Sequence, residues 1–297
     1  PRRRVILFLI IFTRSPRPLP NGGGACYNGG MNLILCCDYG LDDAAATVDA
    51  LSHAAADGYE CAALVAAGGN VPPEISLANA KKLVAHLPFE TVPLVVVDTT
   101  AEEQPAEYLK NIHGDDGMGD LFSDDDGFSA PVVAFSDWLA QLEGEYDLLS
   151  LGPMTLVPRI LARGAVRKFV FMGGNVAETP NFHGYEFNHA LDRAAFAAVT
   201  RRYAHVAVTM DTCRHPLLNV QNVDLSGGGL QRRIVARARE MTFVSGEKGC
   251  YIWDDMAVKA LRHPDWFSLY EAEDRDGNRL TVAKYTHGKP YLEILEE

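Results

Sequence analysis

The sequence predicts a single α/β domain with a mainly parallel central sheet and helices on both faces, a Rossmann-like open sheet. Three observations predict this fold class. From Met31 onward, short apolar runs alternate with longer helical patterns, as in successive strand–helix units. Most runs are apolar almost throughout, which indicates strands buried on both faces. Polar and glycine-rich turns follow several runs, as at the ligand-binding edge of such sheets.

Each expected element has a local reason. Strands are expected at the apolar runs, which cover residues 32–37, 61–67, 92–97, 146–151, 167–172 and 205–210. Helices are expected between them, several opening with a proline or with an Asp or Thr cap, at residues 42–56, 73–87, 105–112, 131–142, 155–162 and 192–201. Residues 226–229 mark a break before a final helical part. No internal repeat or interdomain linker is evident, so residues 31–297 are expected to form one catalytic domain.

Residues 1–30 are expected to take no part in the fold. Arg2 to Arg4 and the apolar residues 5–12 resemble the start of a secretory signal, but the apolar stretch is too short to span a bilayer. Residues 15–30 are rich in Pro and Gly, which predicts disorder. We therefore expect a disordered extension or a non-native leader, with secretion through residues 1–30 as the alternative.

The charge balance and the cysteines narrow the class of protein. The 39 acidic and 27 basic residues give a formal net charge of −12, which argues against a nucleic-acid partner because phosphate binding needs a basic surface. No membrane partner is expected either. The six cysteines show no CxxC spacing, and Cys36 and Cys37 lie within an expected buried strand. A reduced, cytoplasmic location fits this usage best.

An acidic cluster follows the first strand. Asp38, Asp42 and Asp43 would repel one another in a poorly solvated cleft unless a cation or a proton offset them, and a hard divalent cation is the simplest answer. Gly40 permits the tight turn, and the last two aspartates would fall in a first helical turn, where the helix dipole favours negative charge. The plainer interpretation is that Asp42 caps the helix and Asp43 is an ordinary first-turn acid.

Polar segments in a fixed order resemble those of the inosine-uridine preferring nucleoside hydrolase family. Residues 37–44, Cys-Asp-Tyr-Gly-Leu-Asp-Asp-Ala, resemble its aspartate-rich N-terminal motif. Five further segments resemble later motifs of the family in the same order: Gly69-Asn70-Val71 with Asn79, residues 112–119, residues 151–155, the stretch from Met172-Gly173-Gly174 to Glu186-Phe187-Asn188, and residues 253–257. The resemblance runs from Met31 to about Val258 and implies a nucleoside hydrolase-like fold.

The resemblance implies roles for particular residues. Asp38, Asp43 and Asp254 would ligate a metal through side chains and Thr155 through its backbone carbonyl, and an all-oxygen set suits Ca²⁺. The aspartate at the Asp38 position would be the general base for an attacking water. The ribose hydroxyls would be held by Asp42, Asn70, Glu186 and Asn188, with Asn181 near the 5′-hydroxyl, although its spacing to Glu186 is one residue shorter than the family usually shows. His113 would be a further substrate-binding residue.

Each residue taken alone has a plainer interpretation. Thr155 could cap the helix after Pro153, and Glu186 and Asn188 could cap the helix near Asp192. Asn70 alone is more often a turn residue, and His113 a loop histidine. What favours a site is that most of these residues lie at or near predicted strand ends, where unrelated caps have no reason to gather.

The sequence departs from the family at one position beside the expected site. Trp253 stands before Asp254, where many members have a histidine that protonates the leaving base. Members specific for purine nucleosides carry tryptophan there and stack it on the base, so Trp253 favours a purine preference; a core or rim tryptophan is the alternative. His113, His183 and His189 are other candidate acids, since imidazole titrates near neutrality.

The expected function is calcium-dependent hydrolysis of the N-glycosidic bond of ribonucleosides to free base and ribose. The partner would be a small-molecule ribonucleoside, and the family leaves a homodimer or homotetramer open. Two alternatives belong to other classes. One is a magnesium-dependent phosphohydrolase, against which the scarcity of basic residues at strand ends and the absence of a P-loop sequence count. The other is a nucleoside-binding module that has lost turnover.

Overall fold

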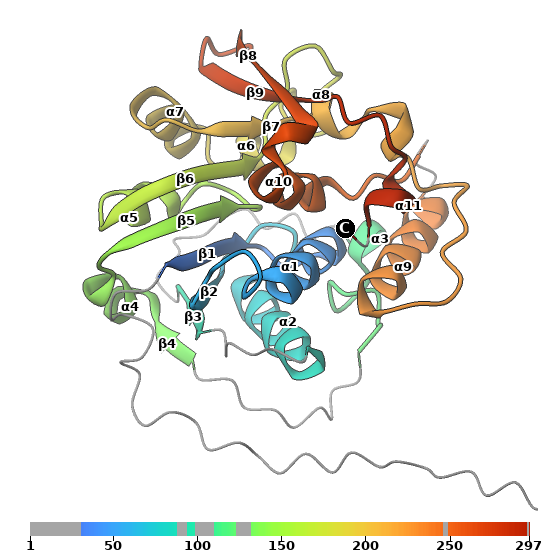
Figure 1. The fold of residues 1–297 in the computed structure, drawn as a ribbon, viewed down its shortest axis with the longest axis horizontal. Helices are drawn as coiled ribbons and strands as arrows, with labels where there is room; N and C mark the ends of the chain where they lie inside the picture. The colour runs from blue at the N-terminus through green and yellow to red at the C-terminus, as the bar shows by residue number, and fades with distance from the viewer. Residues whose placement is uncertain (1–30, 88–93, 99–109, 123–131, 246–248, 296) are drawn as a thin grey trace, which may run out of the picture.

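The computed structural model describes residues 31–87, 94–98, 110–122, 132–245, 249–295 and 297. In these residues, nine strands form one sheet in the order β4-β3-β2-β1-β5-β6-β7-β9-β8, as Figure 1 shows. Neighbouring strands from β4 to β9 pair in parallel, and only β8 is antiparallel to its neighbour. The predicted fold class, an α/β domain on a mainly parallel sheet, is confirmed.

The strands are β1 (Asn32–Cys37), β2 (Cys61–Ala66), β3 (Leu94–Val97), β4 (Val132–Ala134), β5 (Glu145–Ser150), β6 (Ala165–Met172), β7 (Val206–Val208), β8 (Phe267–Glu273) and β9 (Arg279–Tyr285). The helices are α1 (Leu41–His53), α2 (Pro73–His86), α3 (Lys110–His113), α4 (Phe135–Gln141), α5 (Val157–Leu161), α6 (Phe187–Leu191), α7 (Arg193–Arg202), α8 (Met210–Cys213), α9 (Leu230–Ser245), α10 (Trp253–Arg262) and α11 (Tyr291–Ile294), with 3-10 turns η2 (Pro216–Leu218) and η3 (Pro264–Trp266).

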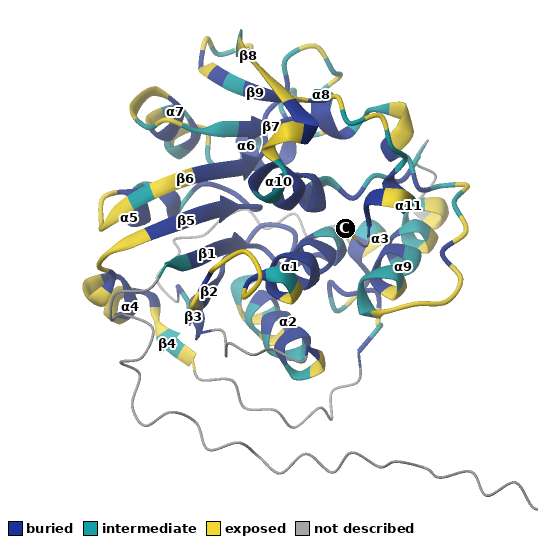
Figure 2. Cartoon of the chain, in the orientation of Figure 1, coloured by how far each residue is buried: buried dark blue, intermediate teal, exposed yellow. Residues whose placement is uncertain are grey.

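Two apolar cores, one on each face of the sheet, explain why the strand sequences are apolar almost throughout. In β1, Leu33 and Leu35 face the core that includes α1, α2, α9 and α10, whereas Ile34 and Cys36 face the core that includes α4, α5 and α7. Figure 2 shows the central strands buried and the outer strands β4 and β8 largely exposed. Removing apolar side chains on both faces from water favours this layering.

Two differences from the expected elements add strands to the sheet. Residues 132–134 form the edge strand β4, paired with β3, so the helix expected at 131–142 begins only at Phe135. The part after residue 229, expected to be helical, contains α9 and α10 but also the antiparallel β8–β9 hairpin, which completes the sheet beside β7. The extension of residues 1–30 and most of the helix expected at 105–112 lie outside the described residues.

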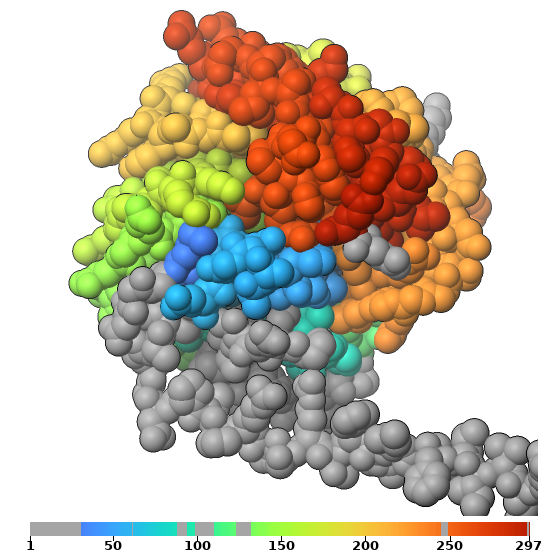
Figure 3. All heavy atoms as spheres, in the orientation of Figure 1, coloured from blue at the N-terminus to red at the C-terminus, as the bar shows by residue number. Residues whose placement is uncertain are grey.

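Helices α1 and α10, far apart in sequence, pack together at the carboxyl edge of β1 and β5. Figure 3 shows the orange and red C-terminal part of the chain packed against the blue residues that include α1. Both helices begin near this edge, so the acidic residues of their first turns approach each other. In the described part of the chain, no helix has the length and apolar character needed to cross a bilayer.

Candidate active site

Asp38 lies in a cradle of backbone at the end of β1. Its side chain is fully buried, and Oδ2 accepts a hydrogen bond from the Asn70 backbone N–H at 2.6 Å. Glycines after β2 and β5 let the chain approach this closely: a Cβ on Gly69 would lie 2.0 Å from Oδ2, and one on Gly152 would lie 2.8 Å from Oδ1. Oδ1 has no hydrogen-bond partner, although it is buried. Burying a carboxylate oxygen without a hydrogen-bond donor costs free energy, and a bound cation or a proton offsets that cost.

Asp43 closes the turn between β1 and α1. Its carboxylate accepts hydrogen bonds from the backbone N–H of Asp38 at 3.2 Å and of Gly40 at 2.9 Å. The Asn70 side chain donates to it at 3.2 Å. Asp43 therefore stabilises the start of α1, as the plainer interpretation holds. The same contacts tie it to Asn70 and to the backbone of Asp38.

Carboxylates from α1 and α10 come close enough to share a cation. Asp42, Asp43 and Asp254 each offer an oxygen, and these oxygens lie within 4.8 Å of one another. Oδ1 of Asp42 is buried without a hydrogen-bond partner. An all-carboxylate set with unsatisfied oxygens fits a hard divalent cation. The metal set expected from the sequence was Asp38, Asp43, Asp254 and Thr155. Of these, the cluster contains Asp43 and Asp254, and the geometry adds Asp42 as a candidate ligand.

Burial disfavours the charged form of these carboxyl groups. Burial and the nearby Asp42 raise the pKa of Asp38 to about 7. Burial, followed by neighbouring carboxylates, raises the pKa of Asp43 and Asp254 well above their usual range. A cation among the three would favour their charged forms and lower these pKa values. The electrostatics thus agree with the cation site that the acidic spacing predicts.

A cavity of about 870 Å³ opens beside the acidic cluster. The residues that line it include all seven predicted substrate-binding residues and one predicted metal ligand: Asp42, Asn70, His113, Asn181, Glu186, Asn188, Trp253 and Asp254. Asp38 is not among the lining residues, but it accepts a hydrogen bond from Asn70, which is. A cavity of this size can enclose a small ligand such as a nucleoside. The structure brings these residues together, and their individual roles stay predictions.

Glu186 and Asn188 face the cavity from the short helix α6. Glu186 is the N-cap residue: its Oε1 accepts from Asn188 N–H at 2.9 Å, and its Oε2 accepts from Gly174 N–H at 2.8 Å and His189 N–H at 3.0 Å. Burial raises its pKa to about 7. The side-chain amide of Asn188 donates to the carbonyl oxygen of Leu151 at 2.7 Å, just after β5. Glu186 thus caps α6 and also lines the cavity, whereas the helix near Asp192, which the plainer interpretation had Glu186 and Asn188 capping, has Asp192 as its N-cap residue.

His113 is held in one tautomer. The Leu41 backbone N–H donates to its Nδ1 at 3.1 Å, so the neutral ring carries its proton on Nε2. Burial lowers its pKa, which keeps the imidazole neutral at pH 7. A neutral imidazole donates a hydrogen bond well but is a weak acid. His113 therefore suits substrate binding better than protonation of a leaving group.

Several predicted residues lie less centrally. Thr155 is in the turn after β5 and is not among the residues that line the cavity; Leu156, not Thr155, is the N-cap residue of α5. Asn181 lines the cavity but is exposed. Of the histidines considered as acids, His189 is buried and stacks on Phe196 with ring centroids 4.0 Å apart, and neither it nor His183 is among the cavity-lining residues.

Sequence reasoning missed Arg214, which lines the cavity, and Asp211, which holds a loop through its carboxylate. Arg214 lines the cavity, lies with its guanidinium carbon 5.6 Å from the ring centroid of Trp253, and pairs with Glu178 at 3.1 Å. Asp211 accepts hydrogen bonds from the backbone N–H groups of residues 176–178. Both residues follow β7, but residues 211–214 differ from the pattern that the resemblance implies at this strand end, so the sequence offered no role for them.

Comparison with known proteins agrees with this geometry. The model of the family described as inosine-uridine preferring nucleoside hydrolase matches residues 33–291. A non-specific ribonucleoside hydrolase, RihC, of Salmonella schwarzengrund is 27% identical over 285 residues, covering 89% of this chain and 88% of that protein. A RihC of Salmonella enteritidis PT4 is 32% identical over 183 residues, 58% of each chain.

Solved structures share the fold. A purine-preferring ribonucleoside hydrolase from Gardnerella vaginalis superposes with a TM-score of 0.67 at 21% identity, covering 89% of this chain and 96% of that one. An inosine-guanosine nucleoside hydrolase superposes with a TM-score of 0.64 at 18% identity over the same shares. At these identities the likeness supports the architecture alone.

Proposed function

The chain belongs to the inosine-uridine preferring nucleoside hydrolase family, and from this premise we propose a calcium-dependent ribonucleosidase that prefers purine nucleosides. Membership makes it an N-ribosyl hydrolase, which splits a ribonucleoside into ribose and a free base. The observation that carries the finer proposal is the meeting of acidic residues from α1 and α10 at one cavity that is also lined by Trp253.

The metal is proposed to be Ca²⁺. Asp38, Asp43 and Asp254, with the carbonyl oxygen of Thr155, are the proposed ligands, and Asp42 joins the candidates because its oxygen lies within 4.8 Å of oxygens of Asp43 and Asp254. All of these donors are oxygens, which Ca²⁺ and Mg²⁺ prefer, and Ca²⁺ tolerates more ligands and less regular geometry. When bound, such an ion supplies positive charge that orients sugar hydroxyls and acidifies water.

Asp38 is proposed as the general base. Its Oδ2 is occupied by the Asn70 N–H, while Oδ1 has no partner and can accept a proton from water. Burial raises the pKa of Asp38 to about 7 without a cation, and a buried carboxylate of this kind is a stronger base than an exposed one. Bound Ca²⁺ would lower this pKa and hold Asp38 in its charged form.

The ribose would be held by Asp42, Asn70, Glu186 and Asn188, with Asn181 near the 5′-hydroxyl. Cleavage of an N-glycosidic bond passes through an oxocarbenium-like sugar that carries positive charge. Carboxylates fixed in advance stabilise that charge at little reorganisation cost. Glu186 is fixed in this sense, because three backbone N–H groups hold its two oxygens.

The purine preference rests on Trp253. Its ring lines the cavity and lies within cation–π distance of Arg214, with Tyr251 edge-on at 6.4 Å between ring centroids. A large aromatic face favours stacking on the larger bicyclic base. The Mg²⁺-dependent phosphohydrolase alternative gains no support, because a phosphate would need basic side chains in the cavity. Among the described residues that line it, Arg214 is the one Lys or Arg, and it is already paired with Glu178. Cytoplasmic location and a homodimeric or homotetrameric state stay predictions.

A nucleoside panel tests the proposed function. Incubation with inosine, adenosine, guanosine, uridine and cytidine, followed by a reducing-sugar assay, is expected to show ribose release that is faster from the purine nucleosides. Trp253→Ala is expected to raise KM for the purine nucleosides several-fold more than for uridine, because it removes a stacking surface worth about 1–3 kcal/mol. Binding without ribose release from any nucleoside would instead show a non-catalytic nucleoside-binding protein.

A further inference from the structure

Glu186 and Asn188, the proposed ribose-binding residues, lie at the start of a helix too short to be stable by itself. Helix α6 has five residues, far fewer than an isolated helix needs for stability in water. The loop before it contains two residues with positive φ, His183 at 42° and Gly184 at 87°. The position of Glu186 and Asn188 must therefore be fixed by contacts from outside the segment.

The turn of the β8–β9 hairpin, residues 274–278, is internally rigid. Asp274 accepts hydrogen bonds at 2.9 Å from the backbone N–H groups of Asp276 and Asn278, and at 2.8 Å from the Asn278 side chain. These bonds use both carboxylate oxygens within the turn. A turn fixed in this way can present its remaining side chains in defined directions.

The side chains of Arg275 and Asp276 form hydrogen bonds with residues on both sides of Glu186. On the N-terminal side, Asp276 accepts from the Tyr185 hydroxyl at 3.1 Å, and Arg275 donates to the carbonyl oxygen of Gly184. On the C-terminal side, Asp276 accepts from Arg193 at 2.8 and 3.1 Å. The guanidiniums of Arg193 and Arg275 also lie over the Tyr185 ring, 4.3 and 4.7 Å from its centroid.

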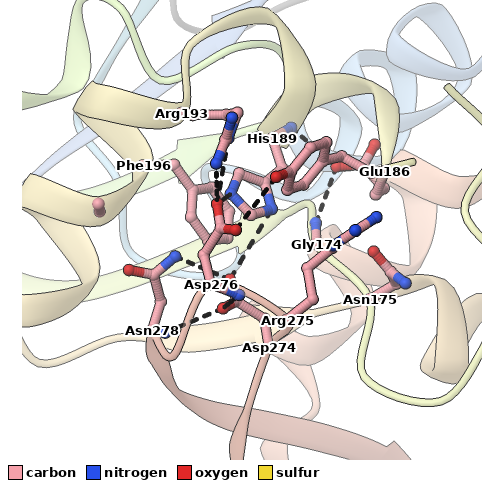
Figure 4. Close-up of polar contacts among 12 residues, drawn as sticks. Gly174, Asn175, Glu186, His189, Arg193, Phe196, Asp274, Arg275, Asp276 and Asn278 are labelled. Carbon is pink, nitrogen blue, oxygen red and sulfur yellow. Dashed lines mark hydrogen bonds and ion pairs between the residues drawn. The ribbon is translucent and has the colours of Figure 1, made fainter. Parts of the chain in front are cut away.

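The side chain of His189, a residue of α6, lies against the hairpin turn, as Figure 4 shows. Its ring is buried against Phe196, and each ring nitrogen lies 3.8 Å from a carboxylate oxygen, one of Asp274 and one of Asp276. Its backbone N–H donates to Glu186. The hairpin turn therefore contacts the residue whose main chain holds the Glu186 carboxylate.

We propose that the hairpin turn 274–278 is a clamp that positions Glu186 and Asn188 for the ribose, with Asp276 as its principal positioning residue. The role of Glu186 and Asn188 in binding ribose rests on the proposed function. The clamp itself concerns only how residues 274–278 hold residues 184–193 in place. Asp276 is not among the residues that line the cavity, so we expect its effect on turnover to pass through its partners Tyr185, His189 and Arg193. Misplacement of about 1 Å at a binding group can cost a factor of about 100 in rate.

Asp276→Ala tests the clamp by kinetics. It is expected to lower kcat/KM for inosine about 10- to 100-fold. A double-mutant cycle with Glu186→Gln separates positioning from general damage, because residues that act through one another are not additive. Asp276→Ala in the Glu186→Gln background is expected to cost less than about threefold. The proposal would be overturned if the losses of kcat/KM in the two single variants multiplied in the double variant. It would also be overturned if Asp276→Ala left kcat/KM unchanged.

Hydrogen exchange provides a readout that needs no turnover. In Asp276→Ala the N–H groups of Gly174, Asn188 and His189, which hold Glu186, are expected to exchange faster, while those of α1 keep their wild-type rates. Equal acceleration in α1 would indicate general loosening and reject the clamp. If wild-type protein releases no ribose but this exchange pattern is found, the proposed function fails and the clamp stands.

Two further variants make the test robust. Tyr185→Phe removes one hydrogen bond to Asp276 and keeps the ring, so it is expected to act in the same direction more weakly, even if Asp276→Ala does not fold. Glu273→Ala is the matched control: it breaks an exposed ion pair with Arg279, 3.6 Å long, on the same hairpin. It is expected to leave kcat/KM and the exchange of residues 182–189 unchanged, and a loss equal to that of Asp276→Ala would contradict the proposal.

Discussion

Replacement of Asp38 by alanine is expected to leave the fold intact and to lower kcat for ribonucleoside hydrolysis by about 10²- to 10⁴-fold, the usual contribution of a general base. The fold should survive because the substitution removes a buried carboxyl group whose charged form is disfavoured there. Its structural cost is one unpaired backbone N–H at Asn70, about 1–3 kcal/mol. Circular dichroism and steady-state kinetics measure the two effects.

Asp38→Asn distinguishes loss of the base from damage to the cradle. The amide oxygen of asparagine can still accept the Asn70 N–H, but the side chain cannot take a proton from water. Asn at this position is therefore expected to restore thermal stability without restoring turnover. Near-normal activity in either variant would reject Asp38 as the base.

Replacement of Lys259 by alanine is expected to lower the free energy of unfolding by about 3–5 kcal/mol, the cost of breaking a buried ion pair. Lys259 Nζ lies 3.1 Å from Asp49 Oδ2, and both side chains are fully buried between α10 and α1. Without the ammonium, Asp49 keeps Arg262, 3.0 Å away, but Asp255 loses a favourable neighbour at a site where burial raises its pKa to about 7. Denaturant unfolding measures the loss.

The same ion pair links stability to the active site. It joins the two helices whose first turns carry Asp43 and Asp254, so weakening it is expected to loosen the acidic cluster as well. Lys289→Ala serves as the control, because its pair with Glu297 is partly exposed and exposed pairs contribute at most about 1 kcal/mol. If Lys259→Ala and Lys289→Ala lowered the free energy of unfolding equally, the buried ion pair would contribute no more to stability than the partly exposed one.

The sequence predicted the centre of the sheet well and its edges poorly. The central strands are buried on both faces, and the apolar runs that follow from this are visible in any sequence. Strand β8 is an edge strand with exposed side chains from Ser268 to Glu271, so its sequence lacks such a run. Strand β4 has three residues and lies at the opposite edge. Edge strands are specified by their pairing partner more than by their own sequence.

The candidate site was predictable because its residues follow strand ends. Asp38 follows β1 and Asn70 follows β2, and a parallel sheet brings the ends of its strands to one edge. The contact between Tyr185 and Asp276 could not be predicted in this way, because the two residues are 91 positions apart and Asp276 belongs to none of the motifs that the sequence shows. Nor could the sequence show that Asp42 lies within 4.8 Å of Asp254.

Calcium binding tests the central claim most directly, namely that acidic side chains from α1 and α10 hold one divalent ion at the cavity. Isothermal titration of chelator-treated protein with Ca²⁺ is expected to show one site per chain, and Asp254→Asn to weaken it at least tenfold. Asp265→Asn, an exposed aspartate beyond the end of α10, is expected to bind as wild type does. Wild-type affinity in Asp254→Asn would contradict the account, since the ion would then lie elsewhere.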